Sequence, residues 1–186
     1  MAPSAATASH GAAHTRARLL DAGVAVAARE GLAGLSVNLV VAEADVAKGT
    51  FYVHFADREA FVDALHAAFH ERVAEAVASA TTGARPGAER LLRGAEAYLD
   101  VCLAEPAIKA LALEARTDTA LTASMSARHE RAAARAVPSF RAMGWPDARA
   151  AAQLLAAMTS EIAVRELDAG RRLPASRRAL RRFLGH

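Results

Sequence analysis

The sequence predicts an all-α protein with a small N-terminal domain and a larger C-terminal one. Hydrophobic residues make up 53% of the 186 residues, and many of them are alanine, the residue best suited to helices. Apolar residues recur every three or four positions, and most glycines and prolines fall between these periodic segments. Runs rich in β-branched and aromatic residues, which would predict strands, are absent from the sequence.

Composition favours an intracellular protein. Residues 1–13 are small and polar, lack the pattern of a signal peptide, and are expected to form a disordered tail. No apolar run approaches the ~20 residues that cross a bilayer, so we expect no membrane partner. The single cysteine, Cys102, excludes an intrachain disulfide and fits a reducing compartment, so we expect the protein to be cytoplasmic.

Two helices and a turn are predicted before residue 46. Residues 16–30 carry an apolar stripe at helical spacing, and Gly31 supplies a C-terminal stop. A short helix then runs from Ser36 to Ala44, with the Ser36 hydroxyl as its N-cap. Asp45 occupies the following turn, and Asp is one of the few non-glycine residues that tolerate a left-handed backbone.

The segment Val46–Phe55 is the most informative part of the chain. Phe51 and Phe55 are four residues apart, so on a helix they share one face that a core can bury. The other faces offer hydrogen-bond donors suited to a phosphate backbone and the major groove, namely Lys48, Thr50, Tyr52 and His54. Taken alone, the segment fits an ordinary surface helix with two core aromatics. The preceding helix and turn favour a helix-turn-helix instead.

Residues 14–77 resemble the DNA-binding domain and connecting helix of the tetracycline-repressor (TetR) family of bacterial transcription regulators. The matching residues are in unbroken register: Gly31, Ser36, Val40, Ala44, Val46, Gly49, Thr50, Phe51, Tyr52, His54, Phe55 and Glu59. The resemblance implies an all-α homodimer whose second and third helices bind a double-stranded DNA operator. It also implies a C-terminal domain that binds a small-molecule effector.

Three positions depart from the family pattern. Asp45 replaces the usual turn glycine, Ala47 replaces the usual Ser/Thr cap, and Val41 is bulkier than the customary alanine. A missing cap costs about 1 kcal/mol of local stability. Asp45 also places a negative charge near DNA, which we expect to weaken affinity.

We therefore assign a DNA-binding domain to residues 14–58 and a ligand-binding and dimerisation domain to residues 59–186. A long connecting helix is capped by Asp57-Arg58-Glu59. Lys48 and Tyr52 are expected to contact mainly phosphate, whereas Val53 and Gly49 can approach base edges. The full set of candidate DNA contacts is Ser36, Asn38, Lys48, Gly49, Thr50, Tyr52, Val53, His54 and Arg58.

The N-terminal domain has no excess of positive charge that would favour DNA binding. Up to residue 58 the basic and acidic residues sum to zero, so we expect reliance on dimerisation. The net charge of +3 comes from a C-terminal run with no acid after Asp168. That run could bind DNA or a membrane, but we favour arginines that face solvent or pair with acids of a partner subunit: Arg171, Arg172, Arg177, Arg178, Arg181 and Arg182.

Further helices are expected beyond residue 80. They span residues 88–104, about 118–143 with an interruption at Pro138, 147–169 and 176–184, with a short apolar piece at 107–113. The helix at 147–169 is apolar on more than one side, so a symmetry mate is expected to cover one of them. Candidate dimer-interface residues are Leu155, Met158, Ile162, Leu180 and Phe183.

Candidates for the effector pocket are His66, Phe69, His70, Tyr98 and Cys102, which share helical faces, although each can equally be a core or surface residue. A ligand beside Phe69 would tilt the connecting helix and separate the two reading helices. His66 and His70 have metal-ligand spacing but no third ligand at persuasive spacing. We expect no metal, no other cofactor and no catalytic residue.

The favoured function is a ligand-relieved repressor with an apolar or aromatic effector. One alternative is a helical metal-dependent enzyme using His66, His70 and Glu71, although no nucleophile–base pair or phosphate loop can be found. Another is a helical adaptor that binds proteins and not DNA. The sequence does not reveal the effector, the operator or whether the regulator represses or activates.

Overall fold

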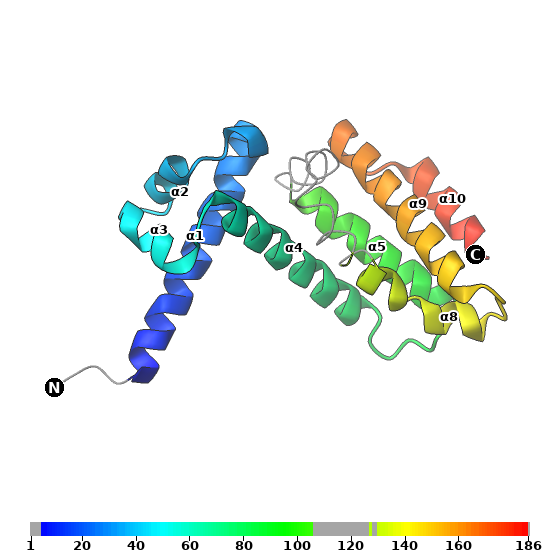
Figure 1. Ribbon diagram of the computed structural model, residues 1–186. Coiled ribbons are helices and arrows are strands. Elements are labelled where there is room, and N and C mark those ends of the chain that lie inside the picture. Colours follow the sequence, from blue (N-terminus) through cyan, green and yellow to red (C-terminus); the bar gives the residue numbers. More distant parts are fainter. Residues whose placement is uncertain (1–4, 106–126, 128–129, 186) are drawn as a thin grey trace. The chain divides into compact units, whose positions relative to one another are not determined.

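The computed structural model describes residues 5–105, 127 and 130–185, and every regular element in these ranges is an α-helix (Figure 1). The predicted all-α class is thereby confirmed. The chain divides into two compact units, residues 1–69 and 70–186. This division falls later than the predicted boundary at residue 58, because Phe61, Val62 and Leu65 are buried and Phe61 packs on Phe51 of the first unit. No described helix combines the length and hydrophobicity needed to cross a bilayer.

Helix α1 (Ala5–Gly34) is longer than the predicted helix at 16–30. It includes residues 5–13, where the sequence predicts a disordered tail; alanine-rich segments have high helix propensity even without an apolar stripe. Gly31 has φ 71° and kinks the helix at the predicted stop, and a short final turn follows. Leu19, Val26 and Ala27 are buried on its inner face.

Helices α2 (Val37–Glu43) and α3 (Lys48–His54) form the predicted helix-turn-helix. The Ser36 hydroxyl caps α2 by accepting the Leu39 N–H at 3.3 Å. Asp45 adopts the predicted left-handed conformation, with φ 49°. Ala47 precedes α3 and provides no side-chain cap, as its sequence indicates.

Helix α4 (Arg58–Ala80) starts where the Asp57 carboxylate accepts the Ala60 N–H at 2.7 Å. Within the first unit it approaches α1 closely at Gly23. A Cβ at Gly23 would lie 2.5 Å from the Phe61 ring and 3.1 Å from Leu65. The glycine therefore permits a close α1–α4 contact that no larger residue allows without a shift.

The second unit contains α5 (Ala88–Ala104), α8 (Val137–Ala142), α9 (Ala148–Ala169) and α10 (Pro174–Phe183). Helix α9 packs beside both α5 and α8 (Figure 1). The bounds of α5 agree with the prediction, and its buried face includes Leu91, Leu92 and Leu99. Helix α10 begins at Pro174, slightly before the predicted start, since proline suits a helical first turn.

The predicted interruption near Pro138 is confirmed. Residues 130–134 are helical, Arg135 and Ala136 form a turn, and Pro138 lies in the first turn of α8. After α8 the Trp145 ring packs edge-on against Phe140, with centroids 5.4 Å apart. The earlier part of the helix predicted from about residue 118 and the apolar piece at 107–113 lie outside the described residues.

A buried carboxylate fixes the chain end to α9. Glu166 has no exposed surface and accepts hydrogen bonds from Arg177 Nε at 2.8 Å, Arg177 Nη2 at 2.6 Å and the Leu173 N–H at 2.8 Å. Arg177 also donates to Asp100 of α5 at 2.7 Å. Burial raises the pKa of Glu166, but the hydrogen bonds from Arg177 and Leu173 outweigh it, so this pKa lies below its ordinary value.

The C-terminal arginines thus differ in part from the prediction that they face solvent or pair with a partner subunit. Their alternation with apolar residues resembles a solvated helix, and sequence does not reveal which acids lie within reach. Three of them pair within their own chain: Arg172 with Asp100, Arg177 with Asp100 and Glu166, and Arg181 with Glu96.

Candidate nucleic-acid interface and cavity

Helix α3 is held by aromatic side chains on its inner face. Phe51 has no exposed surface and packs against Phe55 and Phe61, with ring centroids 5.4 and 5.1 Å apart. Phe55 and Phe61 meet edge-on at 4.9 Å. This cluster joins α3 to the start of α4 and fixes which face of α3 points outward.

The outward face of α3 carries the predicted contact residues. Val53 is 80% exposed and Tyr52 is 50% exposed, and Lys48 is also exposed. A Cβ on Gly49 would meet nothing within 4 Å, so the surface there is open to a bulky partner. Thr50 and His54 are half-buried at its edges. The outward face is therefore a shallow, mixed surface of the kind that can enter a major groove.

Helix α2 contributes a second edge of this surface. Asn38 is exposed near its N-terminus, whereas Ser36 is half-buried and engaged in capping. Leu39 is 41% exposed beside Asn38 and is not among the contacts predicted from the sequence. Its exposure could be predicted from the sequence, because Leu39 lies off the apolar stripe that Val37, Val40 and Val41 form.

Arg58 has a different position from the predicted DNA contact. Its Nε donates to the Leu35 carbonyl at 2.7 Å and its Nη2 to the Leu32 carbonyl at 2.5 Å. These carbonyls belong to the end of α1, where backbone acceptors lack helical partners. Arg58 therefore joins α4 to α1 although its side chain is exposed, and we expect it to contribute less to DNA binding than the sequence predicts.

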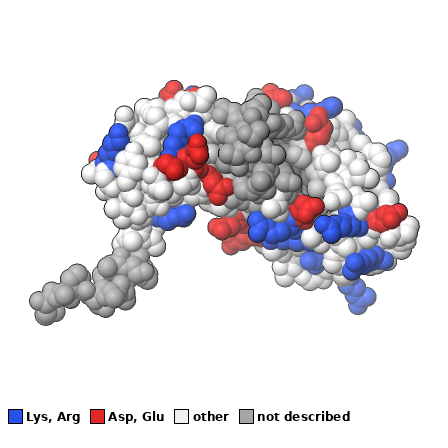
Figure 2. Space-filling view, viewed as in Figure 1, with Lys and Arg blue, Asp and Glu red and all other residues white. Residues whose placement is uncertain are grey.

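Two further arginines of the first unit are also engaged within it. Arg18 donates to the Ala44 carbonyl at 2.6 Å, and the Arg16 guanidinium lies 5.2 Å from the Phe55 ring centroid. On the visible face of this unit, basic and acidic side chains are interspersed and no basic patch forms (Figure 2). Lys48 is thus the main basic side chain on the outward face of α3.

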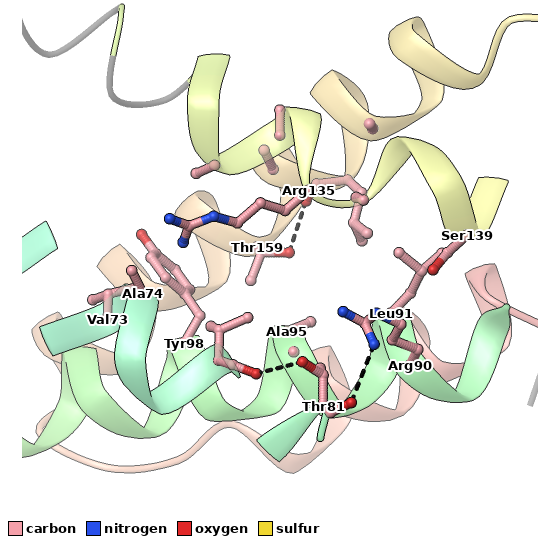
Figure 3. A pocket seen from close by; sticks show the side chains of 18 of the residues that line it. Val73, Ala74, Thr81, Arg90, Leu91, Ala95, Tyr98, Arg135, Ser139 and Thr159 are labelled. Atoms are coloured by element: carbon pink, nitrogen blue, oxygen red, sulfur yellow. Dashed lines mark hydrogen bonds between the residues drawn. The ribbon is translucent and has the colours of Figure 1, made fainter. Parts of the chain in front are cut away.

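The second unit contains a cavity of about 400 Å³ that opens to solvent (Figure 3). Its volume falls within the range of small-molecule sites. Half of its described lining residues are alanine or valine. Its lining residues are Val73, Ala74, Val77, Ala78, Thr81, Arg90, Leu91, Gly94, Ala95, Tyr98, Ala132, Ala133, Arg135, Ala136, Ser139, Ala152, Leu155, Ala156, Thr159 and Ser160.

Of the pocket candidates from sequence, Tyr98 lines this cavity and Cys102 does not. Cys102 is buried behind Tyr98, and burial raises the pKa of its thiol to about 11. Burial and the neighbouring Cys102 also raise the pKa of the Tyr98 phenol above its ordinary value. Both groups are therefore uncharged at neutral pH, and they can offer hydrogen bonds but no charge.

His66, Phe69 and His70 are not among the residues that line the cavity. Phe69 and His66 are buried, and both belong to the first unit. The cavity-facing residues of α4 come later, from Val73 to Thr81 at its C-terminal end. Sequence periodicity places side chains around a helix axis but does not tell how far along the helix a cavity begins.

Metal binding has no support from the described side chains. Among them, no group of three His, Cys, Asp or Glu residues is placed to hold a metal ion. His66 and His70 therefore form no three-ligand site within this part of the chain.

An apolar surface covers the outside of α9 and α10. Leu154 is 65% exposed and Phe183 69% exposed, and the half-buried Met158 and Ile162 lie in a groove between the two helices. Leu155, predicted as an interface residue, instead points into the cavity, because one residue step rotates a helix position by about 100°. Leu180 lines the groove floor and is buried in its own subunit.

These features define a helix-turn-helix protein of the all-α class. Residues 19–65 match the family described as bacterial regulatory proteins, tetR family. This match covers the helix-turn-helix part of the chain, so residues 19–65 form a DNA-binding domain of the tetR type, as the resemblance in the sequence implies. No curated protein sequence matches the chain.

Three solved structures share the fold. A transcriptional regulator from Rhodococcus sp. Rha1 has 23% identity and a TM-score of 0.79, covering 91% of this chain and 94% of the other. A TetR-like regulator from Rhodococcus sp. RHA1 has 19% identity and a TM-score of 0.75, covering 90% and 91%. The regulator FadR from Bacillus subtilis, solved with stearoyl-CoA, has 19% identity and a TM-score of 0.74, covering 90% and 96%.

Proposed function

We propose that this protein is a homodimeric repressor that binds a palindromic operator through α2 and α3 and is released by a small, mostly apolar effector. The observation that carries the proposal is the outward face of α3, where Lys48, Tyr52 and Val53 are exposed on a helix fixed by buried aromatics. The chain acts as a regulator without catalysis, in the cytoplasm where its operator lies.

Each exposed group has a role on DNA. The Lys48 ammonium and the Tyr52 hydroxyl contact phosphates and set the register of α3, with Thr50 and His54 beside them. Val53 offers an apolar contact to thymine methyls, and the open surface at Gly49 lets the backbone come near base edges. Asn38 of α2 can pair with an adenine edge or a phosphate.

Dimerisation supplies affinity that one subunit lacks. With Lys48 as the main cation on α3, one copy releases few counterions from DNA and binds weakly. A two-fold dimer places two reading helices about 34 Å apart, which matches successive major grooves. The apolar surface of α9 and α10, with Leu154, Met158, Ile162 and Phe183, is the face through which we propose that two copies meet.

The cavity of the second unit is the proposed effector site. Its alanine-rich wall favours an apolar ligand over a sugar or nucleotide. One of its lining segments supports a regulatory role, because α4 also contributes Phe61 and Leu65 to the core of the DNA-binding unit. The likeness to FadR, whose structure holds stearoyl-CoA, is consistent with an effector that has a long apolar part.

Selection of genomic fragments by the purified protein, followed by sequencing, tests this function. A short palindrome should be enriched, and Lys48→Ala/Tyr52→Ala should lose most affinity for it at moderate salt. Arg93→Ala serves as the control, because Arg93 is exposed on α5 of the other unit and pairs with Glu89 within one turn. Equal retention of the palindrome by the double variant would overturn the α3 assignment. Absence of any enriched DNA would favour the adaptor alternative.

A further inference from the structure

The charged residues among the described lining of the cavity are both basic. They are the half-buried Arg90 and the exposed Arg135, and no described lining residue is Asp or Glu. Two cations beside a mostly apolar wall favour a negatively charged ligand over a neutral or positive one. Because the rest of the wall is mostly apolar, with a few hydroxyl groups, that ligand needs an apolar body as well.

The two arginines differ in how they are held. Arg90 Nη1 donates to the carbonyls of Thr81 at 3.2 Å and Ala84 at 3.0 Å, so this guanidinium is occupied in fixing the loop after α4. Arg135 makes no hydrogen bond or ion pair with any residue that the structure describes. In Figure 3 its guanidinium extends over the cavity toward Tyr98. Arg135 is therefore the cation available to a ligand.

Ser139 supplies an independent sign of a polar ligand group. Its side chain is 1% exposed and lines the cavity, and its hydroxyl has no hydrogen-bond partner among the described residues. Two other cavity hydroxyls have partners: Thr81 donates to the Val77 carbonyl and Thr159 to the Leu155 carbonyl, each at 2.7 Å. A buried hydroxyl without a partner costs free energy, and a ligand oxygen would remove that cost.

The positions of these groups suggest a ligand with two polar ends. In Figure 3, Arg135 extends toward the Tyr98 side of the cavity, whereas Ser139 lies on the opposite side near Leu91. Apolar side chains of α4, α5 and α9 line the same cavity, including Val77, Ala95 and Ala152. An aliphatic body can pack against these side chains.

We propose that the cavity binds an amphipathic carboxylate: the carboxylate pairs with Arg135, an apolar body lies along the alanine-rich wall, and a distal oxygen hydrogen-bonds Ser139. This assignment rests on the proposed effector site and adds the chemical class of its ligand. The Arg135 contact is a charge-assisted hydrogen bond and sets the preference for an anion. Ser139 adds a smaller preference for an oxygen at the far end.

Calorimetry on the full-length protein with dodecanoate, dodecanol and ω-hydroxydodecanoate tests the charge preference. Dodecanoate should bind at least about tenfold more tightly than dodecanol, and Arg135→Gln should reduce its affinity by about 10- to 100-fold. Arg141→Gln is the matched control, since Arg141 is an exposed arginine of α8 that does not line the cavity. Equal binding of acid and alcohol, or an unchanged Arg135→Gln variant, overturns the assignment.

Variants of Ser139 and Thr159 test the proposed hydrogen bond at the distal end of the ligand. Ser139→Ala should lower the affinity for ω-hydroxydodecanoate about 3- to 10-fold and leave dodecanoate unchanged, without loss of thermal stability. Thr159→Val removes a hydroxyl that already has a partner, so it should cost stability and spare the preference for the hydroxy acid. If both variants lose affinity equally, shape and not the Ser139 hydrogen bond determines binding, and that part of the proposal is wrong.

Operator release is measured separately. If the carboxylate binds through Arg135 but DNA stays bound, the site and ligand class stand and the proposed effector role fails. If operator binding is intact and no carboxylate is preferred, the ligand class fails and the DNA-binding function stands.

Discussion

Two arginines of the first unit stabilise its fold through hydrogen bonds to backbone carbonyls. Arg58 donates to carbonyls of Leu32 and Leu35, and Arg18 donates to that of Ala44. Hydrogen bonds from charged donors to otherwise unpaired carbonyls contribute about 1.5–3 kcal/mol each. Phosphate contact is thereby left mostly to Lys48 and to uncharged donors of α3.

The salt dependence of operator binding separates these two classes of cation. Lys48→Ala should reduce the slope of log affinity against log salt by about 0.9 for each subunit, because one phosphate contact is lost. Arg58→Gln should instead lower the free energy of unfolding by about 1–3 kcal/mol and leave the salt slope of operator binding unchanged. Titrations of operator binding at several salt concentrations measure the slope, and unfolding experiments measure the stability. A slope change in Arg58→Gln would return that residue to the interface.

The turn residue Asp45 provides a second test. Its carboxylate is exposed in the turn between α2 and α3, close to the face proposed to meet phosphates. Asp45→Asn removes the charge and keeps a residue that tolerates φ 49°. We expect operator affinity to rise several-fold at low salt and the gain to shrink as salt screens the charge. Affinity that is unchanged at low salt would place Asp45 away from DNA.

At the scale of helices, local patterns predict more than long-range contacts do. The bounds of α5 follow from its own apolar spacing and the Glu105-Pro106 stop, and the turn at Asp45 follows from its residue type. The direction of Leu155 could not be predicted, because Leu154 beside it is equally apolar and only packing decides which is buried. The role of Arg58 depends on carbonyls more than 20 residues earlier, which no local pattern reveals.

Helix α10 depends on Glu166 for its position. Glu166→Gln removes one partner of a buried ion pair and should cost about 3 kcal/mol of unfolding free energy at pH 7. Because the pKa of Glu166 is lowered in the folded state, its stabilisation is full above the unfolded pKa of about 4.3 and is lost as pH falls through the folded pKa. The free energy of unfolding, measured with denaturant at pH values from 7 to 3, should fall in the wild type. It should fall less in the Glu166→Gln variant.

Glu89→Gln is the control for that measurement. Glu89 pairs with Arg93 one turn away on the exposed side of α5, and such pairs contribute only about 0.3–0.5 kcal/mol. If the free energy of unfolding falls equally with pH in the wild type and in Glu166→Gln, other carboxylates cause the loss of stability in acid.

The outer face of α9 and α10 gives a prediction about assembly. Leu154 and Phe183 are exposed in one subunit, so a charge at either should leave the isolated fold intact. Buried without a partner in a dimer, the same charge costs several kcal/mol. Leu154→Glu/Phe183→Glu should therefore be a folded monomer by light scattering, whereas Gln153→Glu, on an exposed neighbouring position, should remain dimeric. A dimeric double variant would place the interface elsewhere.

Across the whole molecule, α4 is the element that belongs to both units. Its first part supplies Phe61 and Leu65 to the core of the DNA-binding unit, and its last part supplies Val73 and Val77 to the cavity wall. A ligand that favours one position of α4 over another changes the conformations open to α3, because Phe61 packs on Phe51. A free-energy coupling between cavity and operator follows if the two ligands favour different positions of this helix.

Thermodynamic reciprocity makes that coupling measurable from the ligand side. If dodecanoate weakens operator binding by some factor, saturating operator must weaken dodecanoate binding by the same factor, and each tenfold change corresponds to about 1.4 kcal/mol. We expect a factor of about 5–150, the usual range for coupled sites. Calorimetry of dodecanoate binding with and without a short operator duplex, beside operator titrations with and without dodecanoate, gives both factors. Arg135→Gln should need correspondingly more dodecanoate for the same release, while its operator affinity without ligand stays at the wild-type value. Equal dodecanoate affinity in the presence and absence of operator would show that cavity and operator are uncoupled, and the repressor would then need a different release signal.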